Sequence, residues 1–227
     1  MSINKKILFC GRKGDIYSIK AYNFLKKKFT SVIPVWSKQS SKKISINSKI
    51  KNIDILVSFR SYIIFTEEQL RKIKFLCINF HPGPPEYRGF GCANYAIYNK
   101  ENFYGVTTHL INEKIDNGKI INVKKFRLKK NITLQSLLKK THQTLLDQLK
   151  NFFLDLEKKG FDKDQINKKI YNKYKWSKKL GTKKQLDKFY KIEKKISLKE
   201  LKLKIRATKI GQYKPYRIIN KKKYYVE

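Results

Sequence analysis

The sequence predicts an α/β fold, with a Rossmann-like, doubly wound and mostly parallel sheet and a small C-terminal extension made of a helix and a β-hairpin. Short apolar runs alternate with stretches of helical periodicity from residue 6 to about residue 110, which is typical of a parallel sheet with crossover helices. A long amphipathic helix and a Lys-rich tail follow. We therefore expect residues 1–160 to form the main domain and residues 161–227 the extension.

Four apolar runs in the first half predict buried strands. They cover residues 6–11, 31–36, 53–59 and 75–80. The second run contains Pro34, which cannot donate to a strand ladder, so this strand is expected near an edge of the sheet. The fourth run ends at Asn79 and His81. In a doubly wound sheet the ligand crevice lies beyond the carboxyl ends of the strands, which places these two residues at the crevice.

Helices are expected between the strands. Residues 17–29 predict the first, with an inner face made of Ile19, Tyr22, Leu25 and Phe29. The polar residues 37–51 predict a surface loop. Thr66 and Gln69 form a capping box, which predicts a short helix ending near Lys72. Residues 90–98 are also expected to be helical.

The second half begins with two strands, at residues 106–110 and 120–126. A long helix follows and ends near Gly160, which suits a helix C-terminus. Its apolar positions recur at helical spacing and are Leu134, Leu138, Leu145, Leu149, Phe152 and Leu156. A capping box at Ser197 opens a further helix, expected to bury Leu198, Leu201 and Ile205. Asn220 and Lys221 are expected to turn a terminal hairpin.

The chain is strongly basic, with 54 Lys and Arg against 17 Asp and Glu and a formal net charge of +37. This balance suggests anionic partners such as nucleic acid, an anionic membrane surface or phosphorylated small molecules. A compositional explanation competes with it, because Lys, Asn and Ile are abundant throughout, as an AT-rich genome would produce. Arg, the preferred residue for specific phosphate forks, is scarce. The sequence leaves both explanations open.

The three cysteines, Cys10, Cys77 and Cys92, form no CxxC pair. This argues against a disulfide framework and for a reducing compartment, and we expect all three to be small core residues. No apolar stretch reaches the roughly 18 residues that span a bilayer, and no signal peptide is recognisable. We expect a cytoplasmic protein without membrane insertion. No metal site is predicted, and Gly11 and Gly14 do not complete a dinucleotide motif.

Asn79, His81 and Asp116 supply an amide, an imidazole and a carboxylate. Acyl transfer to an amine needs a donor aimed at the oxyanion, a base that works near neutral pH and a carboxylate that orients that base. Asn79 and His81 are two residues apart at a strand end, so their side chains can point to the same side. Each residue alone is more often structural. The prediction therefore rests on their joint occurrence.

Four motifs resemble those of the folate-dependent formyltransferase family. They are Asn79-x-His81-Pro82, Tyr87-Arg88-Gly89, Gly105-Val106-Thr107-x-His109 and Asp116-x-Gly118. The resemblance is specific from about residue 53 to residue 122. It implies the formyltransferase fold, a catalytic domain over residues 1–160 and 10-formyltetrahydrofolate as formyl donor. It also implies that Asn79 stabilises the oxyanion, His81 is the general base and Asp116 orients it.

Members of this family bind the pterin largely through backbone groups of two loops. The resemblance places these loops at residues 59–64 and 112–116. The implied donor-binding residues are Phe59, Arg60, Ser61, Tyr62, Ile63, Asn112, Glu113 and Ile115. Arg60 could equally be an ordinary surface residue. His109 could contact the substrate or be a hydrogen-bonded core histidine.

The tail bears on the acceptor. It is too short for the β-barrel of methionyl-tRNA formyltransferases, whereas glycinamide ribonucleotide transformylases usually stop near the long helix. Its Ile205-Arg206-Ala207 motif and aromatic-rich end resemble nucleotide-sugar N-formyltransferases. This resemblance implies transfer to the amine of a nucleotide-linked amino sugar, such as a dTDP-4-amino-4,6-dideoxyhexose, in glycan or lipopolysaccharide biosynthesis.

Four residues are candidate substrate contacts: Arg88, His109, Trp176 and Tyr213. Trp176 and Tyr213 could stack on a nucleobase, although core packing is the commoner role of such aromatic side chains. Formylation of methionyl-tRNA is the first alternative and is favoured by the charge. A noncatalytic folate- or RNA-binding relative is the second, and the intact trio argues against it. The terminal hairpin could also support a homodimer.

Overall fold

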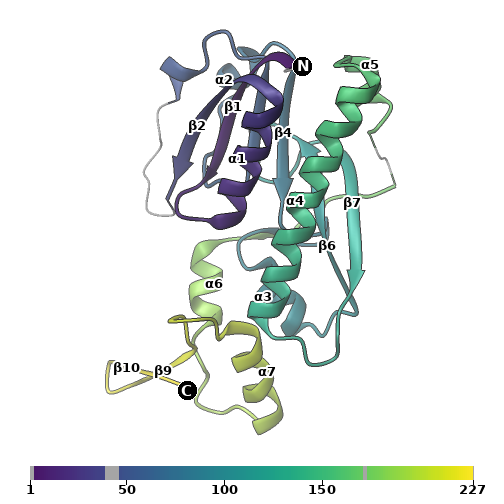
Figure 1. Cartoon of the computed structure of the whole chain (residues 1–227). Helices are drawn as coiled ribbons and strands as arrows, with labels where there is room; N and C mark the ends of the chain where they lie inside the picture. The colour runs from purple at the N-terminus through teal and green to yellow at the C-terminus, as the bar shows by residue number, and fades with distance from the viewer. Residues whose placement is uncertain (1–2, 39–45, 171–172, 227) are drawn as a thin grey trace.

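A six-stranded mixed sheet forms the centre of the computed structural model, which describes residues 3–38, 46–170 and 173–226. The strand order is β2-β1-β3-β4-β6-β7 (Figure 1). Its members are β1 (Ile3–Arg12), β2 (Phe29–Ser37), β3 (Ile55–Phe59), β4 (Leu76–His81), β6 (Phe103–Leu110) and β7 (Ile120–Arg127). The first four strands pair in parallel, whereas β6 pairs antiparallel with β4 and β7. The predicted doubly wound, mostly parallel sheet is confirmed, with the strand containing Pro34 at one edge.

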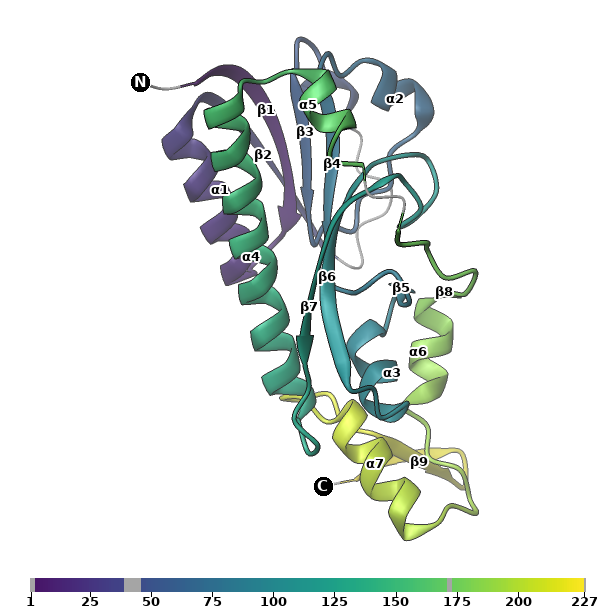
Figure 2. The same cartoon turned by 90° about the vertical axis from the view of Figure 1, so that its right-hand side faces the viewer.

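Helices cover both faces of this sheet (Figure 2). α1 (Ile16–Lys28) and α4 (Leu134–Lys159) lie side by side on one face. The short α2 (Glu67–Arg71) lies towards the other face, and its predicted capping box between Thr66 and Gln69 is confirmed. α3 (Cys92–Tyr98) sits beyond the carboxyl end of β4.

The sheet is apolar on both faces. Side chains alternate along β1, so Ile7 and Phe9 join the core under α1 and α4, whereas Leu8 and Cys10 join a second cluster on the opposite face. The long helix contributes most to the first core, through buried residues that include Leu145, Leu146, Leu149, Phe152, Phe153 and Leu156. Parallel strands buried on both sides in this way hold their carboxyl ends in a fixed row.

Each of two predicted helix faces contains a wrong position. Leu25 and Phe29 are buried as predicted and Tyr22 packs against the core, but Ile19 is 42% exposed, and α1 buries Ser18 and Ala21 instead. The reason is local: the Ser18 hydroxyl is held beneath the helix by bonds to the N-capping Asp15 and from the backbone N–H of Arg12, which rotates Ile19 outwards. Leu198 is 67% exposed at the first position of α7 (Leu198–Thr208).

α7 instead buries Lys204, Ala207 and Thr208. It packs on α3, where Ala207 joins a cluster with Leu134 and Leu137 of α4. The predicted capping box is half present. The Ser197 side chain accepts from the backbone N–H of Glu200, while the Glu200 carboxylate accepts from the Tyr98 hydroxyl.

The surface loop predicted over residues 37–51 is partly buried. Ile46 and Ile50 are almost fully buried in the cluster around Leu8, on either side of a single 3₁₀ turn, η1 (Asn47–Lys49). The polar composition of the segment hides these two apolar anchors. Residues 39–45 lie outside the described residues.

The chain after α4 folds back towards the end of β4. It contains α5 (Lys163–Asn167), β8 (Leu180–Gly181), α6 (Lys183–Phe189), α7, β9 (Tyr216–Ile219) and β10 (Lys222–Tyr225). β8 pairs with β5 (Arg88–Gly89). The predicted terminal hairpin is confirmed, and its turn residues Asn220 and Lys221 both have positive φ, 48° and 63°, as in a type I′ turn. The sequence did not predict α6, which begins at a capping box between Thr182 and Gln185.

Replacing Leu149 by Ala should lower the free energy of unfolding by about 2–5 kcal/mol, because the fully buried side chain would leave a cavity between α4 and the sheet. The matched variant Leu198→Ala, at a position 67% exposed, should change it by less than about 0.5 kcal/mol. Urea titration followed by circular dichroism measures both. Equal effects of the two substitutions would contradict this assignment of the buried helix face.

Candidate active site

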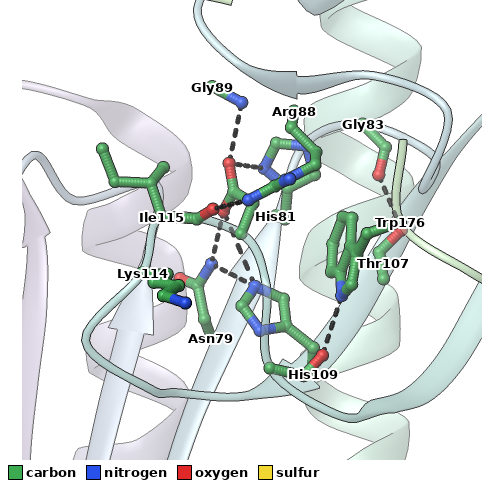
Figure 3. Close-up of polar contacts among 12 residues, drawn as sticks. Asn79, His81, Gly83, Arg88, Gly89, Thr107, His109, Lys114, Ile115 and Trp176 are labelled. Atoms are coloured by element: carbon green, nitrogen blue, oxygen red, sulfur yellow. Dashed lines mark hydrogen bonds and ion pairs between the residues drawn. The ribbon is translucent and has the colours of Figure 1, made fainter. Parts of the chain in front are cut away.

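Two loops meet the carboxyl end of β4 (Figure 3). Asn79 and His81 lie among the last residues of this strand. The pairing of β4 with β6 sets Asn79 opposite His109. Asp116 arrives from the loop between β6 and β7, in a left-handed backbone conformation with φ 43°. The structure therefore brings together the three residues that the sequence predicted as a trio.

The Asp116 carboxylate is the centre of this group. Its Oδ2 accepts from the backbone N–H of Gly89 at 2.9 Å and lies 3.2 Å from His81 Nδ1. Its Oδ1 lies 3.4 Å from Asn79 Nδ2 and 3.6 Å from His109 Nε2. The carboxylate side chain is only 10% exposed. A buried carboxylate needs this number of donors to remain charged.

His81 and Asp116 form an imidazolium–carboxylate pair. Burial alone would lower the pKa of His81, but the charge and hydrogen bond of Asp116 outweigh it and raise that pKa well above its ordinary value. Burial would likewise raise the pKa of Asp116, yet His81 and His109 hold it well below its usual range. The second ring nitrogen agrees with this state, because His81 Nε2 lies 2.8 Å from the carbonyl oxygen of Tyr87. Both nitrogens face acceptors, as only the doubly protonated ring requires.

His109 supports Asn79 from within the protein. It is 2% exposed, and its Nδ1 lies 2.7 Å from the carbonyl oxygen of Leu110. An N–H at Nδ1 leaves Nε2 as an acceptor, and Asn79 Nδ2 lies 2.9 Å from it. This bond directs the amide NH₂ of Asn79 towards His109 and Asp116. The arrangement fits the hydrogen-bonded core histidine that the sequence left open.

The tail closes the other side of the site. Trp176 Nε1 donates to the carbonyl oxygen of Gly118 at 2.7 Å, and its ring lies edge-on to His109 and His81 with centroids 4.9 Å and 5.8 Å away (Figure 3). The guanidinium of Arg88 donates to the carbonyl oxygens of Ile115 at 2.7 Å and Ser177 at 2.9 Å. Trp176 and Arg88 thus fasten residues 115–118 to the tail.

Two glycines permit the close approach of these loops. A Cβ on Gly118 would lie 1.7 Å from the carbonyl oxygen of Leu110, and one on Gly83 would lie 2.6 Å from His81 Nε2. A side chain at Gly118 would displace the loop that carries Asp116, and one at Gly83 would collide with the His81 ring. The Gly89 amide, the Tyr87 carbonyl and the Ser177 carbonyl also belong to the site. Sequence patterns identify the glycines, but backbone contacts of this kind leave no side-chain signal.

The two predicted donor-binding loops contain both buried and exposed side chains. Phe59 is fully buried, whereas Ile64 and Ile115 are exposed apolar side chains. Arg60 has φ 55°, and its guanidinium pairs with Asp15. The remaining predicted positions, Ser61, Tyr62, Ile63, Asn112 and Glu113, lie on the same two loops beside the trio's strand ends. Tyr213 is 61% exposed and pairs with Ile210 on the tail.

Two hollows lie near this region. An open depression of about 810 Å³ lies behind Trp176, between Gly118 and Tyr174, and a groove of about 1020 Å³ lies between α7 and the residues that follow β7. Neither is lined by Asn79, His81 or Asp116. Within the described ranges, no cluster of three His, Cys, Asp or Glu side chains is arranged to hold a metal ion. No helix of this part of the chain is long and apolar enough to cross a membrane.

Solved structures share this architecture. The sugar N-formyltransferase from Shewanella sp. FDAARGOS_354 superposes with a TM-score of 0.77 at 22% identity, over 98% of this chain and 96% of that one. The N-formyltransferase from Helicobacter canadensis, in complex with folinic acid and dTDP-3-aminofucose, superposes with a TM-score of 0.71 at 21% identity, over 96% and 86% of the two chains. At these identities the likeness establishes the fold.

Sequence comparison identifies the family. Methionyl-tRNA formyltransferase from Flavobacterium psychrophilum is 32% identical over 130 residues, which is 56% of this chain and 39% of that protein. The chain spans well under half the length of the curated relatives that it matches. The family model described as Formyl transferase matches residues 18–149, a segment that contains the whole trio. This chain belongs to the formyl transferase family.

Proposed function

We propose that this chain transfers a formyl group from 10-formyltetrahydrofolate to the amine of a nucleotide-linked amino sugar, in the cytoplasm. The observation that carries the choice of acceptor is the extent of the structural likeness. The match to the Shewanella sugar N-formyltransferase covers 96% of that chain and includes the short tail. The bound dTDP-3-aminofucose of the Helicobacter protein supports an amino sugar linked to dTDP.

The donor would lie across the two loops that flank the trio. Ile64 and Ile115 expose apolar side chains there, and a pterin offers a flat apolar face with polar edges. Backbone groups of residues 59–64 and 112–116 would meet those edges. The folinic acid bound to the Helicobacter protein supports a folate donor of this kind.

During the proposed transfer the amine must lose a proton and N10 of the folate must gain one. The amine nitrogen attacks the formyl carbon and a tetrahedral oxyanion forms. The bond from that carbon to N10 of the folate then breaks, while the amine gives up one proton and N10 gains one. We assign Asn79 to the oxyanion, His81 to the amine proton and Asp116 to the orientation and charge of His81. The long 3.4 Å contact from Asn79 Nδ2 to Asp116 leaves this donor able to turn towards an oxyanion.

The proposed base rests in its protonated form. Asp116 raises the pKa of His81 well above its ordinary value, so His81 must lose a proton before it can accept one from the amine. Loss of that proton also breaks one of the two hydrogen bonds of the ring. We expect the 2.8 Å bond to the Tyr87 carbonyl to be the one lost, because its acceptor is uncharged, whereas the other acceptor is the Asp116 carboxylate. Release of Nε2 from this carbonyl would present a free lone pair to the amine.

Methionyl-tRNA is the second candidate acceptor. The charge of +37 and the curated methionyl-tRNA formyltransferase relatives favour it. The tail of this chain, however, aligns with sugar N-formyltransferases. We therefore rank the sugar acceptor first.

Substitution of His81 by Gln should lower kcat by roughly 10²–10⁴-fold, because the side chain can no longer exchange a proton with the amine. Release of tetrahydrofolate measures the rate. The melting temperature is the control, since loss of the pair with Asp116 also removes stabilising contacts. A folded variant that turns over at nearly the rate of the wild type would remove His81 from the mechanism.

The pH dependence of kcat/KM tests the protonation of His81. The base form is populated only above the raised pKa, so activity should rise with pH across a range above 6.5, the ordinary value. In Asp116→Asn, burial acts without the carboxylate, so the pKa of His81 falls and the rising limb should move to lower pH at a reduced maximum. Titration of the acceptor amine gives its own limb, which this substitution leaves in place. Activity that falls over the same range would identify the imidazolium as the active form.

A competition assay tests the acceptor. With 10-formyltetrahydrofolate as donor, we expect tetrahydrofolate release with a dTDP-linked 4-amino sugar and none with methionyl-tRNA, because the tail aligns with that of a sugar N-formyltransferase. Mass spectrometry of the formylated sugar is the control against simple hydrolysis. Turnover with the tRNA alone would establish the second candidate instead.

A further inference from the structure

A second group of charged side chains lies along the same sheet edge as the trio. Arg12 ends β1 and Arg60 follows β3. Gly11 pairs with Phe59, and Phe59 pairs with Phe80, so the ends of β1, β3 and β4 are in register. Neighbouring strands are about 4.8 Å apart, which puts the backbone of Arg12 roughly 10 Å from that of His81 along this edge.

Each of the two guanidinium groups contacts a neighbouring side chain. Arg60 pairs with Asp15, the residue that caps α1, and its side chain is only 5% exposed. The Arg12 guanidinium lies over the ring of Tyr62, 4.4 Å from its centroid. The Nε atoms of both arginines are buried and have no hydrogen-bond partner among the described residues. Buried N–H groups without partners are rare in folded proteins and point to a missing acceptor.

The charges of this group do not balance in the part of the chain that the structure describes. Two guanidinium groups face one carboxylate. His142 adds no charge to this group, because burial, reinforced by Arg60, lowers the pKa of His142 to about 3 and keeps the ring neutral. Burial and the charge of Arg12 lower the pKa of Arg60 to about 10, which still leaves it cationic at neutral pH. Arg12, the cation left without a carboxylate, is half-buried, and an anion would compensate its charge there.

The use of arginine here is itself informative. Only seven of the 54 basic residues are arginine. Arginine offers a planar fork of donors that lysine lacks, which suits it to bidentate binding of phosphate. Three of the seven, Arg12, Arg60 and Arg88, lie at this sheet edge. Arg88 Nε is also without a partner, but the other guanidinium nitrogens of Arg88 donate to the carbonyl oxygens of Ser177 and Ile115. Arg12 and Arg60 are instead the pair that faces a single carboxylate, that of Asp15.

We propose that Arg12 and Arg60 form the binding site for the diphosphate of the acceptor, an inference that rests on the proposed transfer to a nucleotide-linked sugar. Guanidinium groups bind phosphate oxygens through paired, charge-assisted hydrogen bonds. Tyr62, beneath Arg12, stacks on Phe90 with ring planes 13° apart. Phe90 follows the Gly89 amide that binds Asp116. This aromatic pair therefore separates the anion site from the trio, and the sugar would bridge the two.

Titration with inorganic pyrophosphate tests the site without any turnover. The wild-type protein should bind it in a calorimeter, and Arg12→Gln should weaken binding by roughly ten- to hundredfold, because charge-assisted hydrogen bonds are lost. Arg12→Lys, which keeps the charge but loses the fork, should fall between the two. Arg71→Gln removes a surface arginine on α2 that pairs with Glu67, and it should bind as the wild type does. Equal binding by Arg12→Gln and the wild type, or none by the wild type, would overturn the proposal.

A second measurement avoids any effect of substitution on folding. The seven arginines of the wild-type protein give a sparse set of Nε–H signals in the NMR spectrum. Pyrophosphate should shift the signals of Arg12 and Arg60 and leave those of Arg71 and Arg217 in place. Shifts spread evenly over all four signals would mean that pyrophosphate binds the basic surface without a site, and would contradict the proposal.

Steady-state kinetics distinguishes the diphosphate from the other anion at hand, the glutamate tail of the folate. Arg12→Gln should raise KM for the nucleotide sugar and leave KM for 10-formyltetrahydrofolate unchanged. A raised KM for the donor alone would assign the site to the glutamate tail and overturn the proposal. Pyrophosphate binding at Arg12 and Arg60 in a protein that formylates no sugar would instead contradict the proposed function, and would leave the anion site in place.

Discussion

The buried carboxylate of Asp116 is the constraint on which the rest of the site depends. A carboxylate removed from water keeps its charge only if donors replace the water. Here they come from two separate segments: the side chains of Asn79 and His81 at the end of β4 and the backbone of Gly89. Each donor is therefore fixed relative to the others by one acceptor. The left-handed backbone of Asp116 turns its side chain inwards, and Gly118 lets the loop pass close to Leu110.

The tail is part of the same construction. Carbonyl oxygens of Ile115 and Gly118, on either side of Asp116, accept from Arg88 and from Trp176 of the tail. β8 pairs with β5, which contains the Gly89 that binds the carboxylate. The tail lies outside the segment that the family model matches, and it aligns with sugar N-formyltransferases. It thus supports the loop that carries Asp116, the proposed orienting residue. A change in the tail would therefore alter the position of Asp116.

Local patterns predicted most of the fold and the trio. Apolar runs and helical spacing predicted the central strands and α4, and short motifs identified Asn79, His81 and Asp116, which the end of β4 and the loop between β6 and β7 bring together. The misses share a different cause. Ile19 and Leu198 suit a buried helix face, but the orientation of a short helix depends on what its cap and neighbours contact. The position of Trp176 against two histidines depends on the path of the whole tail, which no periodicity encodes.

Two electrostatic environments lie along one sheet edge, and their order would orient a substrate. At the trio, the charges of His81 and Asp116 compensate each other. At Arg12 and Arg60, a single Asp15 leaves positive charge in excess among the described residues. An acceptor with a diphosphate at one end and an amine at the other would bind along this edge in one direction, because the arginines attract phosphate and the compensated pair at the trio does not. The amine must lose a proton during the proposed transfer. Loss of the proton from His81 creates the proposed base, so the raised pKa of His81 would set the pH range in which the chemistry begins.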